Sequence, residues 1–103
     1  QSSTTPLVNE LMPEAMVYNW PNPTEGNYTT IRYWLKEAAD VNIRIYDMVG
    51  ELVREINGAG LGQTDNEVQL ELHDIQSGVY LTRVEAKNGT QKSVAFFKMA
   101  VVK

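Results

Sequence analysis

Apolar and polar residues alternate along residues 41–53, and this stretch predicts the central β-hairpin of the chain. Val41, Ile43 and Ile45 are separated by polar residues, which is the two-residue period of a strand with one buried face. The sequence Asp-Met-Val-Gly at 47–50 then reverses the chain, because aspartate bonds to nearby backbone amides and glycine tolerates positive φ. The other alternating segments need a sheet of this kind to pack against.

Alternating segments on either side of the hairpin predict the remaining strands. We expect these strands at Glu14–Trp20, Tyr28–Leu35, Glu67–Leu72, 78–87 and Gln91–Val102. No segment repeats its apolar residues with the 3.6-residue period of a helix over a helix length. About seven short strands without helices predict an all-β domain, an immunoglobulin-like antiparallel β-sandwich.

The parity of each alternation predicts which side chains face the core. The predicted core residues are Ile31, Tyr33, Ile43, Ile45, Val68, Leu70, Tyr80 and Val84. In the strand that begins at Gly78, the charges of Arg83, Glu85 and Lys87 identify the outward face. Parity also places Trp34 outward, and an exposed tryptophan indicates a contact surface. Packing against a neighbouring module is the first interpretation of Trp34, and stacking on a sugar is the second.

Composition and charge narrow the class of protein. The 103 residues are enough for one domain, predicted as a linker over 1–13 and a sandwich over 14–103. A net charge of −4 argues against nucleic acid or an anionic membrane as a partner. No apolar run approaches the ~20 residues that would insert across a bilayer. The absence of cysteine excludes thiolate metal sites, thiol catalysis and disulfides.

Candidate chemistry is sparse, and we expect neither an enzyme nor a cofactor. His73 is the one histidine, and no serine–histidine–acid order accompanies it, so a surface corner is the expected place for it. The oxygen-rich 65–67 segment lacks the loop pattern of a calcium site and reads as a solvated turn. The glycine-rich 57–62 segment precedes no helix and lacks the lysine of a phosphate-binding loop.

Five segments together resemble a known family, the C-terminal sorting domains of the type IX secretion system, type A. The segments are Trp-Pro-Asn-Pro at 20–23, Thr-Thr-Ile-Arg-Tyr at 29–33, the hairpin at 41–50, Ser-Gly-Val-Tyr at 77–80 and Lys-Met-Ala-Val-Val-Lys at 98–103. Their order and spacing agree with the family from about residue 14 to residue 103. The resemblance implies an immunoglobulin-like sandwich and a role in addressing rather than in chemistry.

The resemblance also implies the partners and the destination. Such domains end a larger secreted cargo protein, and the type IX outer-membrane machinery recognises them. A surface protease of sortase-like type then removes the domain, and we expect that cut within residues 1–12. The cargo is thereby secreted or attached to the cell surface after passing through the periplasm.

The candidate recognition residues are Gly78, Tyr80, Lys98, Lys103 and Trp34. We expect the Lys98–Lys103 segment to hold the address, read by its backbone edge and its terminal carboxylate, because it is apolar on both faces and flanked by lysines. Tyr80 has a structural interpretation as well, since a tyrosine at a sandwich corner commonly bonds back to the backbone.

The alternative function is a carbohydrate-binding or spacer module attached to a secreted glycoside hydrolase. Such a module would use exposed aromatic residues, for which Trp20, Trp34 and Tyr46 are the candidates. The position of the domain in its parent protein separates the two functions, because a sorting domain ends the gene product and a spacer need not.

Overall fold

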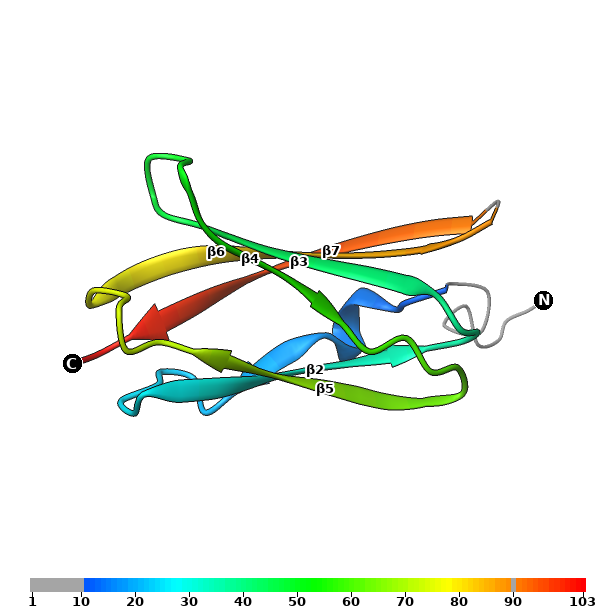
Figure 1. Ribbon diagram of the computed structural model, residues 1–103, viewed down its shortest axis with the longest axis horizontal. Helices are drawn as coiled ribbons and strands as arrows, with labels where there is room; N and C mark the ends of the chain where they lie inside the picture. Colours follow the sequence, from blue (N-terminus) through cyan, green and yellow to red (C-terminus); the bar gives the residue numbers. More distant parts are fainter. Residues whose placement is uncertain (1–10, 90) are drawn as a thin grey trace.

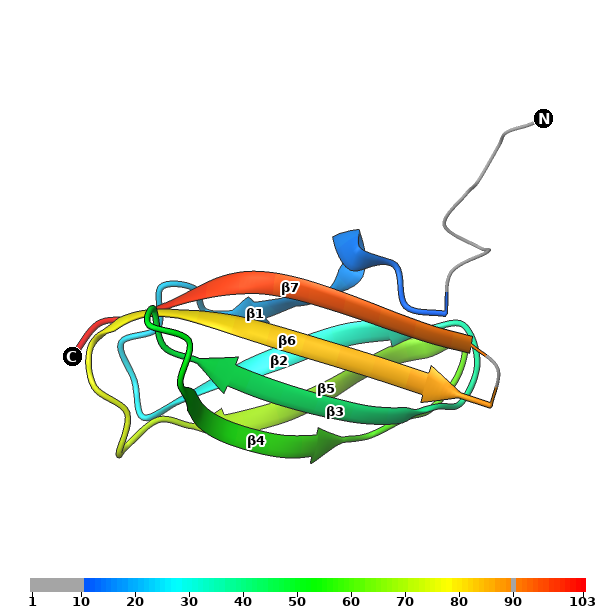
Figure 2. The same ribbon diagram turned by 90° about the horizontal axis from the view of Figure 1, so that it is seen from above.

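Two antiparallel sheets face each other in the computed structural model, which describes residues 11–89 and 91–103 (Figure 1). The first sheet has the order β1-β2-β5 and consists of β1 (Tyr18–Trp20), β2 (Tyr28–Leu35) and β5 (Thr64–Glu71). The second has the order β4-β3-β6-β7 and consists of β4 (Leu52–Gly58), β3 (Asp40–Tyr46), β6 (Gly78–Asn88) and β7 (Gln91–Val101). Strands β7 and β4 form the two edges of the four-stranded sheet (Figure 2). The predicted all-β sandwich of seven strands is confirmed.

The buried faces follow the predicted parity. Ile31, Tyr33 and Leu35 of β2 are fully buried, and the residues between them are half-buried on the other face. Alternation on β6 likewise buries Tyr80 and Val84. Of the eight predicted core residues, seven are buried, and Val68 is partly buried against the same cluster. Burying one such aliphatic or aromatic side chain contributes about 1.5–3 kcal/mol, so these two inner faces hold the sandwich together.

The turn between β3 and β4 has the predicted chemistry. The Asp47 carboxylate accepts hydrogen bonds from the backbone N–H groups of Val49 (3.0 Å) and Glu51 (2.9 Å). Gly50 adopts a φ of 92°, a backbone conformation that glycine reaches without a steric penalty. Asp47 and Gly50 therefore reverse the chain as the sequence indicates.

The first predicted strand is shorter than expected. We predicted it over Glu14–Trp20, but Glu14–Met16 forms a 3₁₀ turn, η2, and the strand begins only at Tyr18. The turn closes because the N–H of Met16 donates to the Pro13 carbonyl at 3.0 Å. A single 3₁₀ turn is thus the helical element in the part of the chain that the structure describes. No helix there is long and apolar enough to cross a membrane.

The last residues of the predicted linker belong to the sandwich. Leu11 and Met12 are 2% and 1% exposed and pack in the core. The Leu11 carbonyl accepts a hydrogen bond from the Lys36 N–H at 2.8 Å, and the Met12 N–H donates to Ser93 Oγ at 3.2 Å. Residues 1–10 lie outside the described residues, so the linker remains a prediction there.

Candidate recognition site at the end of the last strand

The last residue of the chain is bound through both its backbone and its side chain. The Lys103 N–H donates to Ser77 Oγ at 2.8 Å, and the Lys103 ammonium donates to the backbone carbonyl of Leu72. The neighbouring pair of β6 and β7 joins Gly78 to Val101. The predicted motifs at 77–80 and 98–103 therefore lie together at one end of the sandwich.

The motif at 20–23 lies at the same end of the sandwich and covers the outer edge of β7. The Asn22 side chain donates from Nδ2 to the Lys98 carbonyl (2.9 Å) and accepts at Oδ1 from the Ala100 N–H (3.1 Å). The next bonds are backbone ones, from Thr24 N–H to the Ala100 carbonyl and from Val102 N–H to the Thr24 carbonyl, both at 2.9 Å. Asn22 and Thr24 thus act as a short parallel strand beside β7.

This arrangement bears on one expectation from the sequence. We expected a receptor to read the Lys98–Lys103 segment by its backbone edge. Asn22 and Thr24 already occupy the outward-facing groups from the Lys98 carbonyl to the Val102 N–H. A partner strand could add there only by displacing them, because each backbone group forms its ladder bonds with one neighbour at a time.

The local sequence explains why the 20–24 segment leaves β1. Proline has no backbone N–H, so Pro21 and Pro23 cannot continue a ladder of hydrogen bonds. The Pro21 carbonyl instead accepts from the buried side chain of Asn19 at 3.1 Å. Thr24 is fully buried and its hydroxyl donates to the Tyr28 carbonyl at 3.2 Å. The segment is therefore held on both sides of Asn22.

Tyr80 supports the loop that carries Ser77. Its phenolic O–H donates to the Gln76 carbonyl, four residues earlier, at 2.6 Å, and its ring is buried. This is the bond back to the backbone that we predicted for a corner tyrosine. A Cβ atom added to Gly78 would be 3.8 Å from the Tyr80 ring, which is an ordinary contact. The Tyr80 ring therefore does not require a glycine at position 78.

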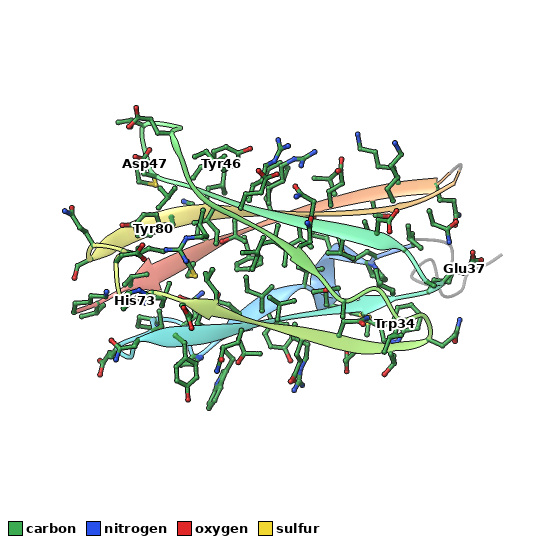
Figure 3. The ribbon with its side chains drawn as sticks, viewed as in Figure 1. Trp34, Glu37, Tyr46, Asp47, His73 and Tyr80 are labelled. Atoms are coloured by element: carbon green, nitrogen blue, oxygen red, sulfur yellow. The ribbon has the colours of Figure 1, made fainter. Side chains whose placement is uncertain are left out.

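A second set of polar contacts joins β4 of the four-stranded sheet to the end of β5 and the residues that follow it. The Arg54 guanidinium on β4 donates to the Glu71 carbonyl at 3.0 Å and pairs with the Asp74 carboxylate. The hydrogen bond from Arg54 to the Asp74 carboxylate holds the pKa of Asp74 below its ordinary value. His73 lies beside them with an exposed side chain, its Nδ1 4.0 Å from Glu71 Oε1, so it occupies the expected surface corner (Figure 3).

Lys98 differs from Lys103 in what its side chain offers to a partner. Lys98 is exposed on the outer face of β7, opposite Leu81 of β6. Four exposed apolar residues are near it. Val79 and Leu81 on β6 and Phe96 on β7 belong to the same sheet, and Val102 follows in the sequence. The Lys103 ammonium, in contrast, is already bonded to Leu72. The surface around Lys98 thus combines a positive charge with apolar contact area.

Trp34 does not belong to this site. It lies near the end of the sandwich opposite to Tyr80 and His73 (Figure 3). Its side chain is on the outer face of β2, as parity predicts, but it is half-buried rather than widely exposed. Trp20, in contrast, is 71% exposed.

The described residues hold no group of three side chains suited to a metal ion. Within the 65–67 segment, the Asn66 side chain bonds to both the N–H and the carbonyl of Leu61, at 3.0 and 2.9 Å. Glu67 pairs with Arg32 across the sheet. These polar groups therefore already have protein partners that hold the loop and the strand.

Sequence reasoning missed the roles of Asn22, Thr24, Ser77 and Leu72. One signal was available for Asn22, because an asparagine between two prolines offers the one side chain there that can replace missing backbone donors. No local signal marks Leu72, since it contributes only its carbonyl oxygen.

The chain matches the family model of the secretion system C-terminal sorting domain over residues 18–96. It belongs to this family. The match includes Asn22 and the 77–80 motif, and it confirms the resemblance to sorting domains of the type IX secretion system. The alternative function, in which the domain is a carbohydrate-binding or spacer module instead of a sorting domain, is not favoured. No curated protein matches the sequence.

Solved structures with the same fold include two from Porphyromonas gingivalis. Dimeric latent PorU is 24% identical, with a TM-score of 0.72 over 84% of this chain and 9% of that one. PorZ, an essential surface component of the type IX secretion system, is 23% identical, with a TM-score of 0.59 over 84% of this chain and 11% of that one. CopC from Methylosinus trichosporium OB3b is 16% identical, with a TM-score of 0.56 over 84% of this chain and 91% of that one. The sorting domain thus spans about a tenth of the first two proteins.

Proposed function

We propose that this sorting domain is the export address of a larger cargo protein that precedes it. The cargo passes through the periplasm and the type IX outer-membrane machinery to the cell surface or the medium. A surface protease of sortase-like type then removes the domain, which itself catalyses no reaction. Membership of the sorting-domain family supports this function, and the partners and the cargo are part of the proposal.

The machinery reads the folded end of the sandwich rather than a free strand. The observation that supports this is the covered edge of β7, where Asn22 and Thr24 bind the backbone from Lys98 to Val102. The same end leaves the Lys98 side chain and the apolar surface around it open to a partner. Apolar contact area beside a charge is typical of a protein interface.

A reporter fusion exported by a type IX-competent host tests this proposal. Lys98→Ala should lower export strongly and leave the thermal unfolding of the purified domain unchanged, because the lysine side chain is exposed. Lys87→Ala is the matched control, since Lys87 is exposed near the other end of β6. Its export should equal that of the parent domain.

Substitution of Lys103 is expected to change both export and thermal stability. Lys103→Ala removes the bond to the Leu72 carbonyl, so lower export should be accompanied by lower thermal stability. Residues added after Lys103 leave that bond possible and test whether the chain end itself is read. Export that survives Lys98→Ala and the added residues would show that the address lies elsewhere, and the 78–80 segment would be tested next.

A further inference from the structure

A hollow of about 440 Å³ lies on the outer face of the three-stranded sheet. Its walls are Tyr18, Trp20, Thr30, Arg32 and Glu67, from all three strands. The strand register explains the shape. Trp20 lies opposite the short side chain of Thr30, and Tyr18 lies opposite Arg32 in the next row, so the floor at Thr30 is lower than its surroundings.

The aromatic wall of the hollow is open to solvent. Trp20 is 71% and Tyr18 is 42% exposed, although the sandwich has a well-formed core on the other face of the same sheet. An exposed tryptophan ring offers a flat apolar surface, and its indole N–H is a hydrogen-bond donor that needs no protein partner in water. The ring is therefore suited to stack on a ligand with an apolar face and polar edges.

The polar wall is fixed and electrically balanced. The Arg32 Nε donates to Glu67 Oε2 at 2.8 Å, and the Arg32 Nη1 donates to the Tyr18 hydroxyl at 3.3 Å. The guanidinium and the carboxylate form an ion pair in which both side chains stay about half exposed. Because Glu67 offsets the charge of Arg32, the hollow does not favour an anion. It offers donors and acceptors side by side.

The β1 edge of the sheet does not favour a peptide that adds as a strand. β1 is only three residues long, and Pro21 directly after it has no N–H to donate. An added strand would therefore find few ladder bonds on that side of the hollow, and such bonds provide the affinity in strand addition. The other edge of the sheet is β5, from which Glu67 lines the hollow, so binding of a polypeptide on that side is an outcome that the test must separate from binding of a sugar.

We propose that this hollow binds one sugar ring of a neutral oligosaccharide. The ring stacks with its apolar C–H face on Trp20, and its hydroxyls exchange hydrogen bonds with Arg32 and Glu67. Neutral sugars match this combination of a flat apolar face with closely spaced donors and acceptors. The site does not depend on the sorting function, because it lies on the other sheet from Lys98.

Nitrogen-15 NMR of the full 103-residue chain tests the site with neutral oligosaccharides of glucose, galactose, mannose and xylose as probes. The chain has two tryptophans, so two indole N–H signals are expected, and Trp20→Ala assigns them. At least one neutral oligosaccharide should shift the Trp20 signal in a saturable way and leave the Trp34 signal in place. Trp20→Ala and Arg32→Ala should each weaken binding about tenfold or more.

The matched control is Tyr28→Ala. Tyr28 is a 54% exposed aromatic residue of the same sheet that does not line the hollow, so its removal should leave binding unchanged. The proposal is overturned if no neutral oligosaccharide gives a saturable shift, or if Tyr28→Ala weakens binding as much as Trp20→Ala. It is also overturned if only acidic sugars bind and salt abolishes their binding, or if a polypeptide alone protects Trp20.

Discussion

The side-chain oxygen of Asn22 accepts a hydrogen bond from the Ala100 N–H at 3.1 Å, across 78 residues of chain. Its amide nitrogen bonds the Lys98 carbonyl in the same way that a neighbouring strand would. Two motifs that are far apart in the sequence therefore form one structural unit. The stability of the last strand depends on this asparagine as well as on β6.

We expect Asn22→Ala to lower the free energy of unfolding by about 1–2 kcal/mol, because two hydrogen bonds to the edge of β7 are lost. Urea unfolding followed by circular dichroism measures the change. Asn27→Ala is the control, since Asn27 is an exposed residue of the same β1–β2 connection and uses its backbone carbonyl in bonding. Equal effects of the two changes would contradict the role of the Asn22 side chain.

Tyr80→Phe should lower the free energy of unfolding by about 1 kcal/mol. The change removes the O–H that bonds the Gln76 carbonyl and leaves the buried ring in place. Tyr28→Phe provides the comparison, because Tyr28 is exposed and should tolerate the loss of its hydroxyl. If both variants unfold at the same urea concentration as the parent, the corner bond has no measurable effect.

Alkaline pH should destabilise the domain through Tyr33. Burial raises the pKa of Tyr33 to about 12, above the ordinary value of 10.0. Between these two pH values the unfolded chain loses the proton and the folded chain keeps it. The free energy of unfolding therefore falls as pH rises through this window, and Tyr33 has no such effect below it.

The slope of stability against pH between about 9 and 11.5 measures this effect. Tyr33→Phe should give a shallower slope than the parent domain, even though it is less stable throughout for want of the bond to the Ala59 carbonyl. Parallel slopes for the two proteins would assign the alkaline sensitivity to other groups.

Leu11 and Met12 should behave as core residues. We expect Met12→Ala to cost about 2–5 kcal/mol, because a fully buried side chain leaves a cavity. Met48→Ala, at an exposed position in the β3–β4 turn, should change stability by less than about 0.5 kcal/mol. If Met12→Ala changes the free energy of unfolding as little as Met48→Ala, residues 11 and 12 are not part of the core and belong to the linker.

Limited proteolysis tests the proposed processing region. Cleavage should occur first before Leu11, since the Leu11 carbonyl is bonded to Lys36, directly after β2, and the Met12 N–H is bonded to Ser93 of β7. Mass spectrometry of the early fragments locates the first cut. A first cut after Arg54 or Lys87 would contradict the proposal.

The fold could be predicted because each strand and turn is specified by residues close together in the sequence. Alternation with a period of two identifies both the strand and its inward face, and Arg83 and Glu85 resolved the one ambiguous strand. The turn at Asp47 is likewise specified by its own residues. Element ends were less certain, because Pro13 closes a 3₁₀ turn where the alternation continued.

The candidate recognition site could be predicted only in part, because it depends on contacts between distant segments. Tyr80 was placed correctly, since its bond reaches back only four residues. The bond from Lys103 to Leu72 and the cover that Asn22 forms over β7 require the three-dimensional arrangement. Burial of Leu11 could not be inferred from a segment without periodic apolar residues.

Gly60 provides the last prediction, which concerns the glycine-rich 57–62 segment. The sequence shows no phosphate-binding pattern in this segment, whose first two residues end β4, and the structure gives Gly60 a structural role. A Cβ atom at Gly60 would lie 1.7 Å from the Ala39 carbonyl oxygen, and the Ala39 N–H donates to the Gly60 carbonyl at 3.1 Å. Glycine is required because the two backbones approach each other so closely.

Gly60→Ala should therefore lower the free energy of unfolding by at least about 1–3 kcal/mol, since one of the two backbones must move to relieve the overlap. Gly26→Ala is the matched control. A Cβ atom there would be no closer than 3.9 Å to its nearest neighbours. Thermal unfolding of the two variants measures the difference. A Gly60→Ala variant as stable as Gly26→Ala would mean that the loop shifts without cost, and that its glycine is not required for the approach to Ala39.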